Sequence, residues 1–260
     1  MNTIQNIGNF NLILAYLLLL IPIAAFGYYK TGLIKATVIA YVRMTVQLFL
    51  LGIYLKWIFK LNNPWLNILW LLLMVLVAAL TIASRTKLTK KMFIIPFFVS
   101  VLITIAIIDI YFLKLVIALD NILNARYFVP ISGMILGNFL KTNIIALNHF
   151  YSSLKKELTL YKFLIGNGAT REEALRRFIG EAIKIAFNPS IANAAVMGLI
   201  ALPGMMTGQL LSGSLPIIAI KYQIMIVITI FVGSMLSVLI TFAILNRSFF
   251  DKFDMPKELN

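Results

Sequence analysis

Residues 199–223 read LIALPGMMTGQLLSGSLPIIAIKYQ, an apolar stretch that prolines, glycines and polar side chains interrupt. Hydrocarbon does not tolerate unpaired backbone polar groups, so a broken helix at membrane depth must be buried in protein or line a cavity. A span that only anchors a protein has no need of such a break. We therefore interpret this segment as part of a translocation path, with these candidate path-lining and gating residues: Pro203, Gly204, Met205, Met206, Thr207, Gly208 and Gln209.

The composition of the whole chain is that of a polytopic membrane protein. Its 260 residues are 61% hydrophobic, whereas soluble domains are about 45–50% apolar, and apolar runs of about 20 residues recur along it. The chain has no cysteine, which excludes disulfides, thiolate metal ligands and thiol catalysis. We expect an all-α fold with a single transmembrane domain over residues 1–260.

Seven candidate spans follow from the apolar runs, and the basic residues orient them. Sixteen Lys and Arg residues fall on one side of these spans and five on the other, while Arg43 and Lys141 lie within spans. Cytoplasmic loops carry the excess of basic residues, so we predict the N-terminus outside and the C-terminus in the cytoplasm. Topology then accounts for the net charge of +14, and no nucleic-acid partner is expected. The predicted spans are 9–29, 36–58, 65–84, 92–113, 127–148, 190–213 and 216–246.

The loop at about 149–189 contains a second informative sequence, GNGATREEALRRFIGEAIKIAFNP at 166–189. Thr170 and Glu173 have the spacing of a capping box, apolar residues follow at helical spacing, and Asn188 with Pro189 predicts the end of the helix. Two interpretations remain open: an amphipathic helix lying among lipid headgroups, or a coupling helix that docks into a groove of an ATPase. The pattern GxxxxGK[ST] is absent, so any ATP must bind another subunit.

Five stretches, spread in order over most of the chain, resemble the FetB-like family of ABC-transporter permeases: RMTVQ (43–47), GMILGN (133–138), GAT (168–170) with Glu173 and Ala174, LPGMMTGQ (202–209) and AIKYQ (219–223). The resemblance implies a multi-pass permease subunit of the bacterial cytoplasmic membrane. Two copies would pair with two cytoplasmic ATPase subunits, which bind ATP and Mg²⁺, while this chain binds no cofactor. The expected contacts with the ATPase are Gly168, Ala169, Thr170, Glu173, Ala174 and Arg177.

The resemblance also implies export of iron, another metal or a metal chelate, because the bacterial member that names the family is implicated in iron export. Plant relatives are tied to aluminium tolerance, and one has been linked to UDP-glucose movement. A different class of protein, an ion-gradient-driven secondary transporter or a channel, is the alternative. Proton coupling usually uses intramembrane acids or histidine, and the predicted spans contain only Asp109, at a span end.

Basic side chains inside the spans suggest the charge of the substrate. Arg43 and Gln47 are four residues apart and share a helical face, and Lys141 lies at a similar depth. If these side chains face inward in a dimer, they place four positive charges in one cavity, which suits an anion such as a metal chelate or a phosphorylated sugar. The alternative for Arg43 is snorkelling to the membrane surface.

The other candidates are small, polar or thioether residues at membrane depth. The pairs Gly133 with Gly137, and Gly204 with Gly208, have the GxxxG spacing that lets helices approach closely. We expect tight packing of the first pair and a path-lining role for the second. The methionine thioethers suit Cu(I) rather than iron and otherwise fill the core, while the amides offer oxygen donors. These path candidates are Met134, Met205, Met206, Asn138, Gln209 and Gln223.

Acidic residues give no metal site that the sequence alone can identify. Asp109 and Asp120 are expected near the outer surface, either as solvated loop residues or as groups that receive an exported cation. Hard and borderline metals prefer carboxylate or imidazole ligands, so a site for bare Fe²⁺ is poorly supported. No arrangement of catalytic residues is evident, and we do not expect an enzyme.

Overall fold

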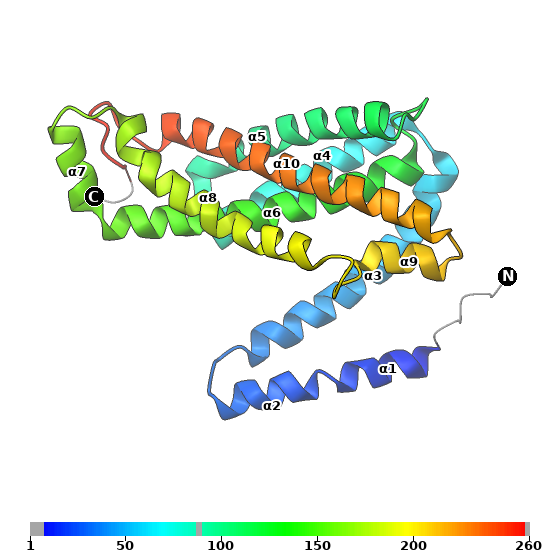
Figure 1. Ribbon diagram of the computed structural model, residues 1–260. Coiled ribbons are helices and arrows are strands. Elements are labelled where there is room, and N and C mark those ends of the chain that lie inside the picture. The colour runs from blue at the N-terminus through cyan, green and yellow to red at the C-terminus, as the bar shows by residue number, and fades with distance from the viewer. Residues whose placement is uncertain (1–7, 87–89, 258–260) are drawn as a thin grey trace.

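The computed structural model describes residues 8–86 and 90–257 (Figure 1), and every regular element in these ranges is a helix. Six helical stretches are long and apolar enough to cross a membrane. The prediction of a polytopic all-α membrane protein is therefore confirmed. The elements are α1 (Asn9–Leu17), α2 (Leu20–Tyr28), α3 (Ile34–Leu61), α4 (Pro64–Arg85), α5 (Lys90–Ile110), η1 (Tyr111–Val116), α6 (Ala125–Lys156), α7 (Leu158–Gly166), α8 (Arg171–Val196), α9 (Gly204–Leu211) and α10 (Pro216–Ser248).

The predicted span at 190–213 is wrong as a continuous helix. Helix α8 runs through Pro189 to Val196, so the predicted helix end at Asn188 is also wrong. A proline inside a helix removes one backbone hydrogen bond, and here Pro189 lies on an exposed part of α8, where its ring meets little opposing protein. The chain connects α8 to α10 through irregular residues 197–203, the short α9 and a turn (Figure 1).

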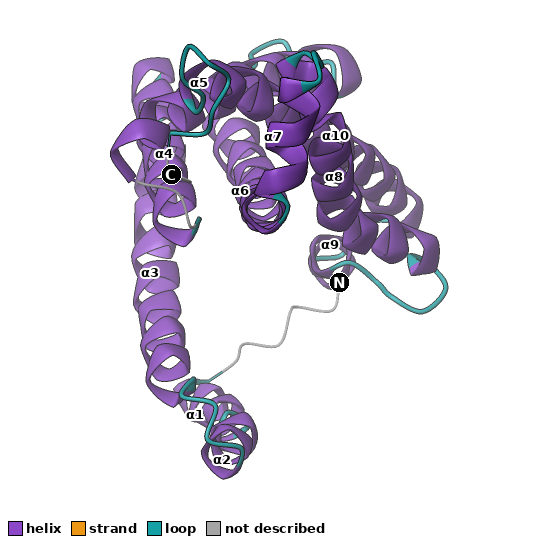
Figure 2. Ribbon diagram, turned by 90° about the vertical axis from the view of Figure 1, so that its left-hand side faces the viewer, coloured by secondary structure: helices purple, strands orange, loops and turns teal. Residues whose placement is uncertain are grey.

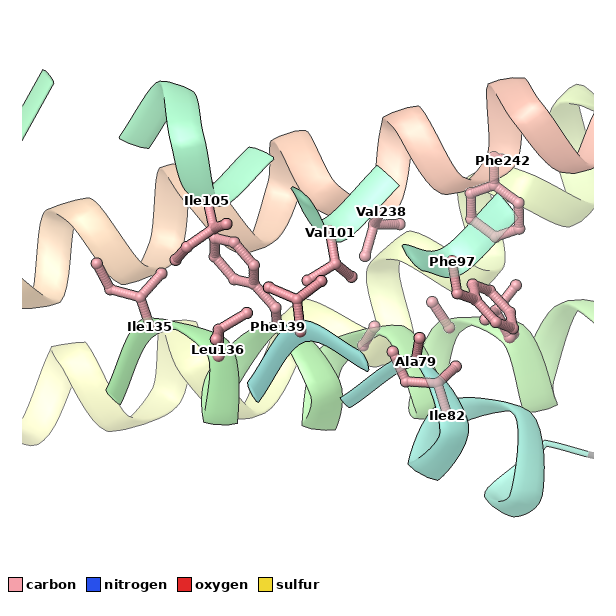
Figure 3. Close-up of a cluster of buried hydrophobic side chains, with 14 of the residues drawn as sticks. Ala79, Ile82, Phe97, Val101, Ile105, Ile135, Leu136, Phe139, Val238 and Phe242 are labelled. Atoms are coloured by element: carbon pink, nitrogen blue, oxygen red, sulfur yellow. The ribbon is translucent and has the colours of Figure 1, made fainter. Parts of the chain in front are cut away.

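The core is a bundle of α4, α5, α6 and α10, with α8 packed along α6. Figure 3 shows Ile82 of α4, Phe97 and Val101 of α5, Phe139 of α6 and Val238 of α10 meeting between these helices. Helices α6 and α10 approach so closely that a Cβ on Gly233 would lie 2.8 Å from the Phe139 ring. A glycine in α10 thus makes room for a core aromatic side chain of α6.

Buried hydroxyl and amide groups connect the helices of the bundle. Ser100 Oγ donates to the Ser237 carbonyl at 3.1 Å and lies 2.8 Å from Thr241 Oγ1, which joins α5 to α10. Asn143 Nδ2 of α6 donates to Ser237 Oγ at 2.9 Å. In hydrocarbon such polar groups must find partners within the protein, so these bonds fix the relative positions of the three helices.

Helices α1, α2 and the first half of α3 form an arm that stands apart from the bundle (Figures 1 and 2). No residue in the apolar windows of these two spans is buried. The hairpin is closed by contacts of α2 with α3 and by a hydrogen bond between Tyr16 and Thr45. The arm therefore presents its apolar surface to lipid or to another chain.

Candidate functional site

Helix α6 buries most of its circumference but leaves one polar face uncovered. Gly137 and Lys141 are exposed on this face, and Met134 and Asn138 are half-buried. Asn138 Nδ2 donates to the Met134 carbonyl at 2.9 Å, and Lys141 has no ion pair within the described ranges. Figure 2 shows α3 on one side of α6 and α8 with α9 on the other. The predicted path residues of α6 thus share one accessible face.

A groove of about 690 Å³ runs between α3, α4 and α6, and it brings two predicted residues together. Gln47 of α3 and Gly137 of α6 both line it, with Tyr54, Trp70 and Leu140 among the other walls. A Cβ on Gly133 would lie 3.0 Å from the terminal methyl of Met74, whereas a Cβ on Gly137 would meet nothing within 4 Å. Gly133 therefore packs closely against Met74, whereas Gly137, for which tight packing was also expected, borders open space in the groove.

Arg43 and Lys141 each lie four residues from a residue that lines the groove. Helices α3 and α6 run in opposite directions (Figure 1), and Gln47 and Gly137 line the same groove. One helical turn from each of these residues, toward the α7 end, brings the chain to Arg43 on α3 and Lys141 on α6. Both side chains are exposed. Two exposed cations therefore lie one helical turn beyond the residues that line the groove.

The LPGMMTGQ stretch is broken, as predicted, and forms a short helix between two turns. Helix α9 covers Gly204–Leu211, and the glycines at 198 and 213 on either side have φ values of +84° and +90°. These values lie in the left-handed region that favours glycine. A Cβ on Gly204 or Gly208 would meet nothing within 4 Å, so this GxxxG face packs against no other part of the described chain.

Helix α9 packs beside α10 and does not reach the groove between α3 and α6. Thr207 Oγ1 donates back to the Pro203 carbonyl at 3.1 Å, so its hydroxyl is used within α9. Gln223 of α10 is buried, and its Oε1 has no hydrogen-bond partner in the described chain. The α9 candidates and Gln223 thus form a group separate from Arg43, Gln47, Asn138 and Lys141.

The interpretation of Asp109 as a solvated loop residue is wrong. The helix continues beyond it as the π-helix η1, and Asp109 is 2% exposed inside the bundle. Ser132 Oγ lies 2.6 Å from Asp109 Oδ2 and 2.6 Å from the Phe128 carbonyl. Asp109 Oδ1 is buried without a partner. Because one hydroxyl proton cannot serve two acceptors, a proton on the Asp109 carboxyl would satisfy both short contacts.

Ligands for a metal ion are sparse in the structure. No group of three His, Cys, Asp or Glu residues within 8–86 and 90–257 is placed to hold one. Met205 and Met206 are neighbours on α9, while Met134 lies on α6. The accessible face of α6 offers a cation and an amide instead, which are groups that bind anions.

At the α7 end, the predicted capping box is confirmed. Thr170 N and Oγ1 donate to Glu173 Oε2 at 2.8 and 2.7 Å, and Glu173 N donates to Thr170 Oγ1 at 3.3 Å. These hydrogen bonds, first that of the Thr170 side chain, hold the pKa of Glu173 below its usual range. Gly168 precedes the cap with φ of +89°, so the turn before α8 favours glycine.

The apolar stripe of α8 packs against the protein's own core, which neither interpretation of this helix foresaw. Ala174, Phe178 and Ala182 are buried in the same core cluster as α6. Near the start of α8 the polar side remains outside, where Arg177 forms ion pairs with Glu157 at 3.5 Å and Glu181 at 3.2 Å. Further along the helix Ile185 and Ile191 are exposed as well. A partner or a membrane surface could therefore reach Thr170, Glu173 and Arg177, but not Ala174.

The residues after α10 fold back onto the start of α8, a contact that the sequence did not signal. We call residues 250–257 the C-terminal strap. The Asp254 carboxylate accepts from Arg171 Nε at 2.7 Å and pairs with its second terminal nitrogen at 2.5 Å. Tyr161 Oη of α7 donates to the Asp254 carbonyl at 2.6 Å. Burial, together with the nearby Asp254 charge, raises the pKa of Tyr161 to about 12.

Comparison with known proteins gives several relatives that cover most of the chain. It is 33% identical over 249 residues to the UPF0014 membrane protein YjkA of Bacillus subtilis, which covers 95% of this chain and 98% of YjkA. It is 30% identical over 254 residues to FetB of Escherichia coli, named as a probable iron export permease. The match covers 95% of this chain and 94% of FetB. ALUMINUM SENSITIVE 3 of Arabidopsis thaliana is 31% identical over 192 residues. The match covers 74% of this chain and 68% of that protein.

No solved structure matches the chain. The family described as "Uncharacterised protein family (UPF0014)" matches residues 9–250, nearly the whole length. The resemblance found in the sequence motifs is confirmed, because FetB is among the relatives. The bundle, the six apolar spans and these matches together show that the chain belongs to the UPF0014 family of multi-pass membrane proteins.

Proposed function

We propose that this chain is the membrane subunit of an ATP-binding-cassette exporter, in which two copies work with two cytoplasmic ATPase subunits. The observation that carries the proposal is the uncovered face of α6, with Asn138 and Lys141 in the middle of a spanning helix. A charged or amide side chain facing hydrocarbon is costly, and such residues normally face a protein interior or a wet cavity. One copy of the chain supplies only one wall of that cavity.

A second copy placed against this face would complete the path. Helix α6 and the arm of α1–α3 border the same open side of the molecule in Figure 2, so one partner chain can cover both. In such a dimer Arg43 and Lys141 of each copy would border one cavity. ATP and Mg²⁺ would bind the ATPase subunits, and this chain would hold no cofactor of its own.

The proposed substrate is iron or another metal in the form of an anionic chelate. FetB, a relative, is named as a probable iron export permease, which supports the metal. The basic and amide groups on the α3 and α6 faces support the anionic form, because they attract carboxylates and repel bare cations. An anionic small molecule such as a nucleotide sugar would use the same groups.

The test is ATP-dependent transport by the reconstituted permease and its nearest encoded cassette ATPase. Inside-out vesicles should accumulate ferric citrate when ATP is supplied, and Lys141→Ala should lower the rate by about tenfold, the effect of losing one charge-assisted hydrogen bond to the substrate. Lys221→Ala, which changes an exposed lysine at the far end of α10, is the matched control. Equal transport by wild type and Lys141→Ala would refute the anionic path, and transport without any ATPase would refute the exporter.

The second candidate is transport driven by an ion gradient, and Asp109 is the observation that favours it. A buried carboxyl with one unpartnered oxygen inside a membrane bundle is a common proton-binding group in pumps and transporters. The two candidates separate on Asp109→Asn, which keeps the shape of the side chain but cannot release a proton. An ATP-driven permease would keep its transport rate, whereas a proton-driven transporter would lose it.

A further inference from the structure

Two phenylalanine side chains are exposed at the α7 end, where the positive-inside pattern predicts the cytoplasm. Phe163 of α7 is 64% exposed and Phe253 of the C-terminal strap is 81% exposed. Most other exposed large apolar residues lie in the six spans, where lipid covers them. Phe163 and Phe253 lie outside every span, so an aqueous phase would surround both rings unless a partner covers them.

The two segments that carry these rings are bonded together. Tyr161 Oη donates to the Asp254 carbonyl, and Arg171 pairs with the Asp254 carboxylate at 2.5 Å. The Tyr161 ring also lies 5.7 Å from the ring of Phe250. Helix α7 and the strap are therefore held as one surface before any partner arrives, which lowers the entropy cost of binding.

The length of α6 places this surface beyond the lipid headgroups. Helix α6 has 32 residues, which rise about 48 Å at about 1.5 Å each, whereas the hydrocarbon core needs about 20 residues. Counted from Tyr127, the core ends near Leu147, and Lys156 lies about 13 Å further on. Headgroups occupy only about 5–8 Å on each side. A bilayer is thus too far away to cover Phe163.

The charge around the two rings is positive. Glu157 and Asp254 are paired with arginines, and Asp251 accepts hydrogen bonds from Phe253 N and Met255 N in the strap. These three acidic groups are therefore engaged within the chain, while Glu172 at the start of α8 is exposed. The exposed lysines around the rings are Lys155, Lys156, Lys162, Lys252 and Lys257.

We infer that α7 and the C-terminal strap form the docking surface for the ATPase, with Phe163 and Phe253 entering an apolar groove whose rim is acidic. This inference rests on the proposed function and moves the contact away from the α8 stripe, which is buried. Exposed aromatic anchors surrounded by charged residues are the usual composition of a strong protein contact. The strap ties the end of α10 into this surface, so movement of the docked ATPase would reach a membrane helix directly.

The first experiment measures binding of the nearest encoded cassette ATPase to the full chain in detergent. Phe163→Ala and Phe253→Ala should each weaken binding by about tenfold or more, as removal of an interface anchor does. Phe49→Ala is the matched control, because Phe49 is 61% exposed but lies in the middle of α3. All three side chains are exposed, so the variants should elute and melt like the wild type.

Tight binding of the wild type with unchanged binding of both variants would overturn the docking surface and leave the proposed function standing. No binding of the ATPase to the wild type would overturn both. A separate readout uses the absence of cysteine in the chain. In inside-out vesicles, whose outer face is the predicted cytoplasmic side, a membrane-impermeant maleimide should label Phe163→Cys. The same reagent should fail to label it after the ATPase is added. Protection of Phe163→Cys by the bilayer alone would assign the surface to lipid and refute the inference.

Discussion

The ion pair between Asp254 and Arg171 should control how firmly the C-terminal strap is held, and two substitutions separate its charge from its backbone. Asp254 has φ of +59°, in the left-handed region. Asparagine tolerates that region, whereas alanine there costs about 1 kcal/mol. Asp254→Asn therefore removes only the charge of the pair, while Asp254→Ala removes the charge and adds backbone strain.

The magnitudes follow from exposure. The side chains of Arg171 and Asp254 are 29% and 35% exposed, so the pair is partly screened by solvent and contributes about 1 kcal/mol. Local opening of the strap should become about fivefold more frequent in Asp254→Asn. In Asp254→Ala the total is about 2 kcal/mol, which corresponds to about thirtyfold.

Hydrogen exchange of two strap amides measures this opening. Asp251 N donates to the Met255 carbonyl at 2.9 Å, and Lys257 N donates to the Phe249 carbonyl at 3.0 Å, so both report closure of the strap. Lys252→Ala, an exposed position without an ion pair within the described ranges, should leave their exchange unchanged. Equal exchange in Asp254→Asn and Asp254→Ala would refute the strain argument, and wild-type exchange in both would refute the role of the ion pair.

Three further predictions concern packing, capping and pH. Gly233→Ala should destabilise the bundle by about 1–3 kcal/mol, because the new Cβ would lie 2.8 Å from the Phe139 ring. The Cβ of Gly208→Ala meets open space, so this control should unfold like the wild type when thermal unfolding is measured in detergent. Ala174→Lys should abolish folding, since the site is 1% exposed, while Glu173→Lys should leave a folded protein that only loses its cap, as gel filtration would show. The pKa of Tyr161 is raised to about 12. The neutral Tyr161 side chain therefore stabilises the fold fully below pH 10, its usual pKa, and this stabilisation is lost as the pH rises toward 12. Tyr161→Phe should abolish that loss, as measured by hydrogen exchange of the strap.

The sequence predicted those features that depend on local physics. Hydropathy located six of the seven expected spans, because the cost of burying polar groups in lipid acts on each segment separately. The capping box at Thr170 was equally local, since its donor and acceptor are three residues apart. The break at LPGMMTGQ was also predictable, because proline and glycine act on their own helix.

Features that depend on distant contacts could not be predicted in this way. Helix α8 continues past Pro189 to Val196 although this part of the helix is exposed, and hydropathy does not distinguish that continuation from the predicted end. The hydrogen-bond partner of the buried Asp109 is Ser132, which follows it by 23 residues. Arg171 and Asp254 are 83 residues apart, and nothing near either residue signals the other. The sides of the membrane on which the two termini lie stay a prediction.

Exposed surface in this chain has two meanings, because its solvent is partly hydrocarbon. Leu18 and Ile21 in the arm are 67% and 70% exposed, yet lipid tails solvate them as well as protein would, so their exposure alone does not require a partner. Lys141 is exposed within the spanning helix α6, and lipid solvates an ammonium group poorly. The polar face of α6, and not the apolar arm, therefore requires a second copy or water. A monomer in the membrane would have to admit water along that face, and a dimer would enclose the same water as a path.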